Sequence, residues 1–222
     1  MQQNKKLNII LVGATGLVGS RLLRFSIINE QIERIVLLSR KSSDTTHPKI
    51  TEHLVDFNTP ESYRSLVKGD LVFCCIGTTI KAARSKENFV KVDYTYPLEI
   101  AKAAKENLVP AYHLVTALGA DANSSIFYNK VKGQVQDAIA ALGFDVCCFY
   151  QPSMLLGDRT ESRPTEKIGQ KLMVFFDFLI PSLYKAIDGG FVAQAMIENA
   201  LHAKTGIQII PSDQLLKLAK NA

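Results

Sequence analysis

Residues 8–23 read Asn-Ile-Ile-Leu-Val-Gly13-Ala-Thr-Gly16-Leu-Val-Gly19-Ser-Arg-Leu-Leu, a hydrophobic run that passes through three glycines into a second apolar segment. The run before Gly13 predicts a buried strand, and the apolar spacing after Gly16 predicts an amphipathic helix. In the pattern GxxGxxG, the first glycine permits a tight turn and the second a close approach of the backbone to a diphosphate. The third glycine lets helix and strand pack closely. The stretch therefore predicts the first β-α unit of a dinucleotide-binding fold.

The start of the predicted helix is the expected phosphate site. Its free backbone N–H groups are donors, and the helix dipole favours negative charge. A purely structural turn is the alternative, but the strand before the glycines and the helix after them favour the binding site. We expect the loop to contact a nucleotide cofactor through Gly13, Thr15, Gly16, Leu17, Val18 and Gly19.

Beyond this loop, short β-branched runs alternate with longer amphipathic segments, which is typical of parallel strands joined by crossover helices. The predicted strands are Leu7–Val12, Arg34–Ser39, Ile50–Val55, Asp70–Ile76, Ala111–Val115, Asp145–Gln151 and Gly206–Ile210. The predicted helices are Leu17–Ile28, Pro60–Val67, Phe89–Glu106, Phe127–Leu142, Phe191–His202 and Ser212–Lys220, the last with Ser212 as its N-cap. The strands are almost continuously apolar, as expected when helices cover both faces of a sheet. The predicted fold class is α/β, a doubly wound parallel sheet (Rossmann-like) with a short C-terminal excursion on the substrate side.

The length of 222 residues suits a single domain, 1–222, in which residues 153–190 form the substrate-side segment. The net charge of +5 includes no run of five or six basic residues, so nucleic-acid binding is not expected. No apolar run is long enough to span a membrane, and the N-terminal run is too short for a secretory signal. The hydrophobic stretch Leu172–Ile180 predicts a buried helix or, alternatively, a subunit interface. Monomer and homodimer both stay open.

The cysteines occur as two adjacent pairs, Cys74-Cys75 and Cys147-Cys148, inside predicted strands. Neighbouring strand residues point to opposite faces, so neither pair can converge on one metal ion. We therefore expect reduced thiols, a cytoplasmic location and no metal site. The histidines lack metal-ligand spacing, and His113 is expected to be a hydrogen-bonded core histidine.

The end of the second predicted strand bears on the choice of nucleotide. NAD sites often carry an acidic residue about 20 positions beyond the glycines, where it holds the ribose hydroxyls. Here the chain reads Ser39-Arg40-Lys41, without a carboxylate. Because a guanidinium presents a planar fork to phosphate oxygens, we predict that Arg40 and Lys41 bind the 2′-phosphate of NADP(H). A solvated basic turn is the alternative.

Two further loops at strand ends are expected to meet the same cofactor. Asp56 and Phe57 follow the third strand, where the carboxylate would accept from an adenine amine or simply shape the turn. Gly77 and Thr78 follow the fourth strand, where a glycine lets the backbone approach the ligand.

Tyr128 and Lys132 are four residues apart, which brings them to one face of a predicted helix. A free phenol has a pKa of about 10, and a nearby ammonium favours the phenolate that acid–base chemistry needs. Thr116 ends the fifth strand and offers a hydroxyl. The spacing alone is common by chance, so a surface pair is the alternative.

Together these features resemble the short-chain dehydrogenase/reductase superfamily. Within it they are most similar to the atypical branch that contains the Tat-interacting oxidoreductases and their bacterial relatives. The most specific stretches are LVTALGAD at 114–121, FYNKVKG at 127–133, QPSMLLGDR at 151–159 and ESRP at 161–164.

The resemblance implies a role for each matching residue. Tyr128 would exchange a proton with the substrate oxygen, and Lys132 would hold the nicotinamide ribose and lower the phenol pKa. Thr116 would stand where a serine usually orients the substrate, and Pro152 and Ser153 would touch the nicotinamide carboxamide. The segment Lys91-Val92-Asp93 stands where relatives often have Asn, so no fourth catalytic residue is assigned.

We therefore expect an NADP(H)-dependent oxidoreductase of the atypical short-chain dehydrogenase type that acts on an unidentified small carbonyl or alcohol. The alternative is a non-catalytic or weakly catalytic NADPH sensor that binds a protein partner, because the resemblance extends to proteins of that kind. A sugar-nucleotide epimerase is disfavoured, because the chain after Gln151 is short for a sugar-nucleotide subdomain. The charged loop Gly157–Pro164 is expected either to gate the substrate or to be solvated.

Overall fold

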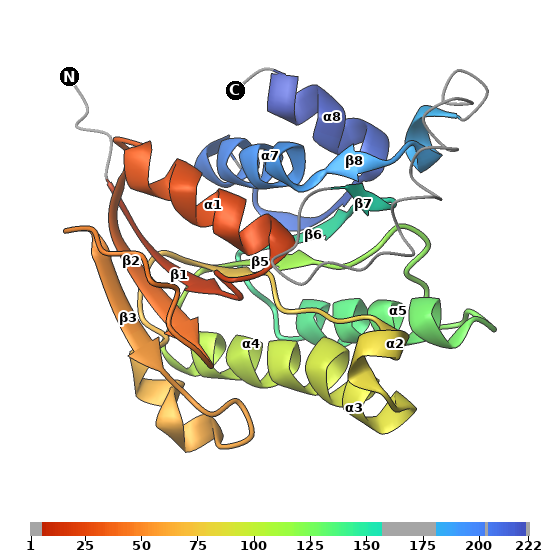
Figure 1. Cartoon of the computed structure of the whole chain (residues 1–222), viewed down its shortest axis with the longest axis horizontal. Coiled ribbons are helices and arrows are strands. Elements are labelled where there is room, and N and C mark those ends of the chain that lie inside the picture. The colour runs from red at the N-terminus through yellow and green to blue at the C-terminus, as the bar shows by residue number, and fades with distance from the viewer. Residues whose placement is uncertain (1–5, 157–180, 203, 221–222) are drawn as a thin grey trace.

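A seven-stranded parallel sheet forms the centre of the fold, in the order β3-β2-β1-β4-β5-β6-β9. The structure is a computed structural model that describes residues 6–156, 181–202 and 204–220. Helices α1, α7 and α8 cover one face of the sheet, and α4 and α5 cover the other (Figure 1). The predicted doubly wound α/β class is confirmed.

The strands follow the predicted ones to within two residues at either end. They are β1 (Leu7–Val12), β2 (Ile32–Ser39), β3 (Ile50–Leu54), β4 (Leu71–Cys74), β5 (Ala111–Val115), β6 (Val146–Gln151) and β9 (Gly206–Pro211). The longer helices are α1 (Leu17–Ile28), α4 (Tyr96–Glu106), α5 (Phe127–Ala140), α7 (Gly189–His202) and α8 (Ser212–Lys220).

The sheet separates two hydrophobic cores, and β1 shows how. Ile9 and Leu11 lie in the cluster that contains residues of α1 and α7. Ile10 and Val12 lie in the cluster that contains residues of α4 and α5. Because successive strand residues point to opposite faces, a strand covered on both sides is apolar at successive positions, as residues 9–12 are.

The predicted helix Phe89–Glu106 is longer than expected and is not uniform. Three segments follow one another without a break: α3 (Lys86–Val90), the π-helical turn η3 (Lys91–Thr95) and α4. In η3 the amide of Tyr96 donates to the carbonyl of Lys91, five residues earlier. Pro97 accounts for the wider turn, because in an α-helix its ring would strike the carbonyl of Asp93 and it has no N–H to donate there.

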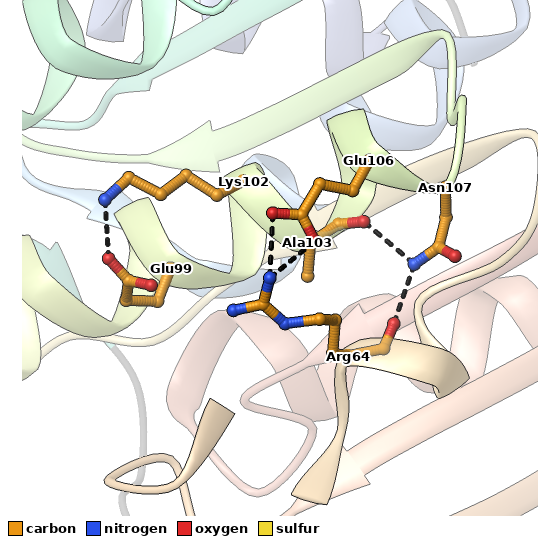
Figure 2. Close-up of polar contacts among 6 residues, drawn as sticks. All are labelled: Arg64, Glu99, Lys102, Ala103, Glu106 and Asn107. Carbon is orange, nitrogen blue, oxygen red and sulfur yellow. Dashed lines mark hydrogen bonds and ion pairs between the residues drawn. The ribbon is translucent and has the colours of Figure 1, made fainter. Parts of the chain in front are cut away.

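The predicted helix Pro60–Val67 is wrong. The segment forms two short 3-10 turns, η1 (Pro60–Ser62) and η2 (Arg64–Leu66). A segment this short is marginal as an α-helix without tertiary support. Here contacts with the end of α4 favour a turn (Figure 2). The Arg64 guanidinium binds Glu106, and the backbone carbonyl of Arg64 accepts from the side chain of Asn107.

The C-terminal excursion contributes a second, small sheet. Strands β7 (Leu155–Leu156) and β8 (Ile187–Asp188) pair in parallel, with the 3-10 turn η5 (Ser182–Tyr184) before β8. Ser212 is the first residue of α8 and its hydroxyl pairs with Ser153, so the predicted N-cap is corrected to the first helical position. The segments Gly157–Pro164 and Leu172–Ile180 lie outside the described residues.

All four cysteines are free in the structure, and their reduced state in the cell stays a prediction. No group of three or more metal-ligating side chains occurs in the described part of the chain. Within the same residues, no helix is both long and apolar enough to cross a bilayer.

His113 is buried, as predicted, but only one of its two ring nitrogens has a hydrogen-bond partner among the described residues. Its Nδ1 lies 2.8 Å from the Tyr150 hydroxyl, and its buried Nε2 has no partner among the described residues.

Candidate active site

The glycine loop lies at the carboxyl end of β1, beside the point where the strand order reverses between β1 and β4. Gly13 has a φ of +89°, and a Cβ there would stand 2.8 Å from the backbone of Cys75, after β4. A Cβ at Gly19 would stand 2.1 Å from the Gly13 carbonyl oxygen. Loop, helix and neighbouring strand thus meet at a distance that only glycine allows. In doubly wound sheets, the crevice at this point is where ligands bind.

The N-terminus of α1 fits an anionic group. Its N-cap is Gly16, which has no side chain to cap the helix, and the first turn holds no acidic residue. Thr15 and Gly16 are exposed, whereas Leu17 is half-buried and Val18 is buried. The first N–H groups of the helix are therefore left to solvent or a ligand, and no carboxylate offsets the helix dipole. These residues fit the diphosphate of a dinucleotide.

Arg40 and Lys41 lie at the same edge of the sheet as the glycine loop. Val12 pairs with Leu38, so the chain leaves β1 and β2 at the same level. Both cationic side chains are exposed, and within the described part of the chain neither forms an ion pair. The loop that follows is held by Glu52, which accepts from the amide of Ser43 at 2.9 Å. Two unpaired cations on an anchored turn are suited to a phosphate.

Asp56 and Phe57 follow β3 but differ in exposure. Asp56 is exposed, and one carboxylate oxygen accepts from the amide and side chain of Asn58 at 2.9 and 2.7 Å. These bonds hold the pKa of Asp56 below its ordinary value. The turn-shaping role left open by the sequence is therefore present. Phe57 is buried, and its ring packs against Tyr63 and Tyr96. Contact of either residue with a cofactor stays a prediction.

Lys132 is buried one turn after Tyr128 and forms an ion pair with Asp93 of η3, with Nζ 2.8 Å from Oδ1. The other carboxylate oxygen of Asp93 accepts from the amide of Thr78 at 2.9 Å. A Cβ on the exposed Gly77 would stand 3.6 Å from Lys132 Nζ. Three elements distant in sequence thus converge on one ammonium at the carboxyl end of β4.

Burial alone would lower the pKa of Lys132, because a charge is costly away from water. The charge of Asp93 and then that of Tyr128 outweigh it, so the pKa of Lys132 lies above its ordinary value. The lysine is therefore a permanent cation at neutral pH.

Tyr128 is half-exposed on α5, and its ring packs 5.4 Å from that of Phe89. Tyr128 lies one helical turn before Lys132, on the same face of α5, and a phenol hydroxyl is able to exchange a proton with the oxygen of a bound molecule. The predicted residues Tyr128, Lys132, Gly77 and Thr78 therefore gather with Asp93, which the sequence left without a role.

Thr116 is buried, and its hydroxyl is engaged within the protein. It donates to the carbonyl of Tyr150 at 3.2 Å and accepts from Gln136 Nε2 at 2.6 Å. Gln151 in turn donates to Gln136 at 3.3 Å. A substrate-orienting role for Thr116 stays a prediction. In the structure its hydroxyl is bonded to Tyr150 and Gln136 instead. Gln136 went unnoticed in the sequence, although its position four residues after Lys132 places it on the same helix face.

Pro152 and Ser153 connect the site to the C-terminal excursion. The buried Pro152 accepts from the amide of Leu118 at 2.9 Å. The Ser153 hydroxyl donates to the Lys185 carbonyl and lies 3.0 Å from the Ser212 hydroxyl. These bonds fix the strand end next to β8. The predicted contact of the two residues with a nicotinamide is compatible with their place at the carboxyl end of β6 and stays a prediction.

Known proteins resemble this chain over most of its length. Residues 9–136 match the NAD dependent epimerase/dehydratase family. Protein HTATIP2 of Rattus norvegicus is 31% identical over 227 residues, which cover 99% of this chain and 91% of that protein. Protein FMP52, mitochondrial, of Candida albicans is 32% identical, covering 97% of this chain and 99% of that protein. The resemblance predicted from the sequence is confirmed.

Solved structures with low sequence identity share the fold. The UDP-N-acetylglucosamine 4-epimerase from Methanobrevibacter ruminantium superposes with a TM-score of 0.71 at 14% identity, covering 96% of this chain and 81% of that chain. The Bordetella bronchiseptica enzyme WbmF, in complex with NAD+, also gives 0.71, at 13% identity, covering 99% and 78%.

Proposed function

The chain belongs to the NAD dependent epimerase/dehydratase family, and on this basis we propose that it is an NADP(H)-dependent oxidoreductase of the atypical short-chain dehydrogenase type. Its proposed substrate is a small carbonyl or alcohol. The observation that carries the proposal is the convergence of Tyr128 and the buried Lys132–Asp93 pair beside Gly77, at the same edge of the sheet as the uncapped glycine loop.

Each residue of the site has a distinct task in this proposal. The cofactor, when bound, supplies or accepts a hydride. The N-terminus of α1 binds the diphosphate, and Lys132 donates to the ribose hydroxyls. Tyr128 exchanges the proton of the substrate oxygen, one helical turn from the Lys132 ammonium.

The preference for NADP(H) over NAD(H) rests on the end of β2. Arg40 and Lys41 are exposed there and unpaired in the described part of the chain, and the turn carries no carboxylate to hold the 2′-hydroxyl. A 2′-phosphate would bring two negative charges to these cations. The free thiols suit a reducing compartment, so a cytoplasmic location is part of the same proposal.

The test is NADPH oxidation in the presence of a panel of aldehydes and ketones. Tyr128→Phe is expected to lower kcat/KM by about 100-fold or more, because general acid–base catalysis contributes on that scale. Its NADPH affinity should stay within about twofold, since the phenol is assigned to the substrate. Tyr63→Phe is the matched control, because it removes a buried hydroxyl that has no hydrogen-bond partner among the described residues. Turnover that survives Tyr128→Phe contradicts the assigned role.

A second candidate function is an NADPH sensor that reports nucleotide occupancy to a protein partner. The observation that favours it is Thr116, whose hydroxyl is already used by Gln136 and Tyr150. Tight NADPH binding without turnover of any panel member, in wild type and Tyr128→Phe alike, would support the sensor. Turnover that depends on Tyr128 would exclude it.

A further inference from the structure

The Lys132–Asp93 ion pair differs from the other ion pairs of the described residues in its burial. The side chains of Lys132 and Asp93 are 5% and 0% exposed. Lys102 and Glu99, also an ion pair and on the neighbouring helix α4, are 46% and 25% exposed (Figure 2). Removing two charges from water is costly, and apolar residues of equal volume often stabilise a protein as well or better. A buried pair at a ligand crevice therefore points to a function beyond stability.

Asp93 lies in an irregular, π-helical turn of the backbone. Pro97 lies four residues after Asp93, and a regular α-helix would bring its ring against the Asp93 carbonyl. The chain instead forms the π-helical turn η3, which contains Asp93. Such turns shift the register of a helix locally and are frequent at functional sites.

The carboxylate joins two parts of the proposed cofactor site. Oδ1 holds Lys132 of α5, and Oδ2 accepts from the amide of Thr78, which follows β4. A Cβ at Gly77 would stand 3.4 Å from Asp93 Oδ1 and 3.6 Å from Lys132 Nζ. Gly77, which is exposed and has no side chain, therefore lies next to both charged groups of the pair.

We propose that Asp93 is a positioning residue: its carboxylate, presented by the π-helical turn, fixes the Lys132 ammonium next to Gly77 and connects it to the loop that contains Thr78. A free lysine side chain samples many rotamers, and the ion pair selects one of them. The inference rests on the proposed function for the identity of the ligand that Lys132 serves. The pairing itself is independent of that ligand.

The groups that face Lys132 are Asp93 from η3, Tyr128 from its own helix and Cys74 from β4. Burial raises the pKa of the Cys74 thiol, so it is neutral in the range of interest. Asp93 is the principal group that opposes the effect of burial on Lys132. Without its charge, native Lys132 is expected to lose its proton below the pH at which the unfolded chain does.

Urea unfolding of Asp93→Asn between pH 7 and 10 measures this directly, without any cofactor. The unfolded lysine keeps its proton up to about pH 10.4. Where the native lysine of Asp93→Asn is neutral and the unfolded one is still charged, stability of this variant increases with pH. The ratio of its folding equilibrium constant to that of wild type then rises by up to about tenfold per pH unit. Asp93→Glu keeps the charge, and Glu99→Gln removes a carboxylate from the exposed pair, so both should give flat ratios. A destabilisation of Asp93→Asn that is the same at every pH overturns the proposal.

Should Asp93→Asn fail to fold, the double variant Asp93→Asn/Lys132→Met keeps the test decisive. It leaves no buried charge unpaired and is expected to recover folding. A double variant as unstable as the single one contradicts the pairing.

NADPH calorimetry on the same proteins connects the pair to the ligand. Asp93→Asn is expected to bind NADPH about tenfold more weakly than wild type, with partial recovery in Asp93→Glu and no change in Glu99→Gln. If wild type binds NADPH and Asp93→Asn binds it equally well, the positioning role fails while the proposed function stands. Wild type could bind no NADPH while the stability of Asp93→Asn relative to wild type still rises with pH. In that case the cofactor assignment fails, but the positioning of Lys132 by Asp93 stands.

Discussion

Substitution of Gly19 by alanine tests the close contact between the glycine loop and α1. The new Cβ would stand 2.1 Å from the Gly13 carbonyl oxygen, 2.8 Å from its carbon and 3.2 Å from the Ala14 Cα. All three atoms belong to the backbone, so no side chain can turn aside. Restoring an ordinary separation of about 3.5 Å requires the loop and the helix to part by more than about 1 Å.

The expected cost follows from two opposing effects. Overpacking of this kind costs about 3 kcal/mol, the upper part of its usual range, because the obstacle is backbone. Alanine inside a helix recovers about 1 kcal/mol relative to glycine. The net loss of about 2 kcal/mol lowers the Tm of a chain of this length by roughly 4–8 °C. Thermal and urea unfolding followed by circular dichroism measure both quantities.

Gly16→Ala is the companion variant, because it separates folding from binding. Gly16 is exposed, its backbone is extended, and a Cβ there would be 3.3 Å from the Gly13 oxygen. Stability should change by less than about 1 kcal/mol, whereas NADPH affinity should fall about tenfold if the diphosphate approaches the loop here. A Gly19→Ala protein within about 0.5 kcal/mol of wild type would refute the packing argument. Unchanged NADPH affinity of Gly16→Ala would refute the diphosphate assignment.

Two further predictions concern buried polar groups. Burial lowers the pKa of His113 to about 3, so the native state stays neutral while the unfolded chain takes up a proton below about pH 6.5. Stability should therefore fall from about pH 6.5 toward 3 by at most about 1.4 kcal/mol per unit; urea unfolding of His113→Phe should lack this part of the slope, and parallel curves would contradict it. Thr116→Val leaves Gln136 without its acceptor and should cost about 1–3 kcal/mol. Thr116→Ser should cost less than about 1 kcal/mol, and equal losses in the two variants would show that the hydroxyl does not stabilise the fold.

The fold was predictable because its signals are local. The three glycines of residues 13–19 lie where a strand passes into a helix, and a Cβ at each of them would come close to neighbouring backbone atoms. Residues 9–12 of β1 are all apolar and point alternately to the two faces of the sheet, which is what two helical layers require. The helical period places Tyr128 and Lys132 on one helix face, but that spacing is common by chance, and the two residues were assigned to the site through the resemblance to the short-chain dehydrogenase/reductase superfamily.

Other features depend on tertiary contacts that no local pattern shows. Asp93 acquires its role from Lys132, which is distant in sequence, and from a π-helical turn. Pro97, four residues later, is the one local signal for that turn. The apolar spacing of Tyr63 and Val67 indicates a helix, but the hydrogen bonds of Arg64 to residues at the end of α4 favour 3-10 turns. The direction of the Thr116 hydroxyl depends on Gln136, on another element.

The most direct test of the central claim is calorimetric titration of wild type and Arg40→Ala with NADPH and with NADH. Hydrogen bonds to a charged group contribute about 1.5–3 kcal/mol, so wild type should bind NADPH at least about tenfold more tightly than NADH. Arg40→Ala should lose most of that preference. Arg34→Ala, an exposed arginine about 20 Å away at the other end of β2, should keep it. Equal affinity of wild type for NADH and NADPH would contradict the account.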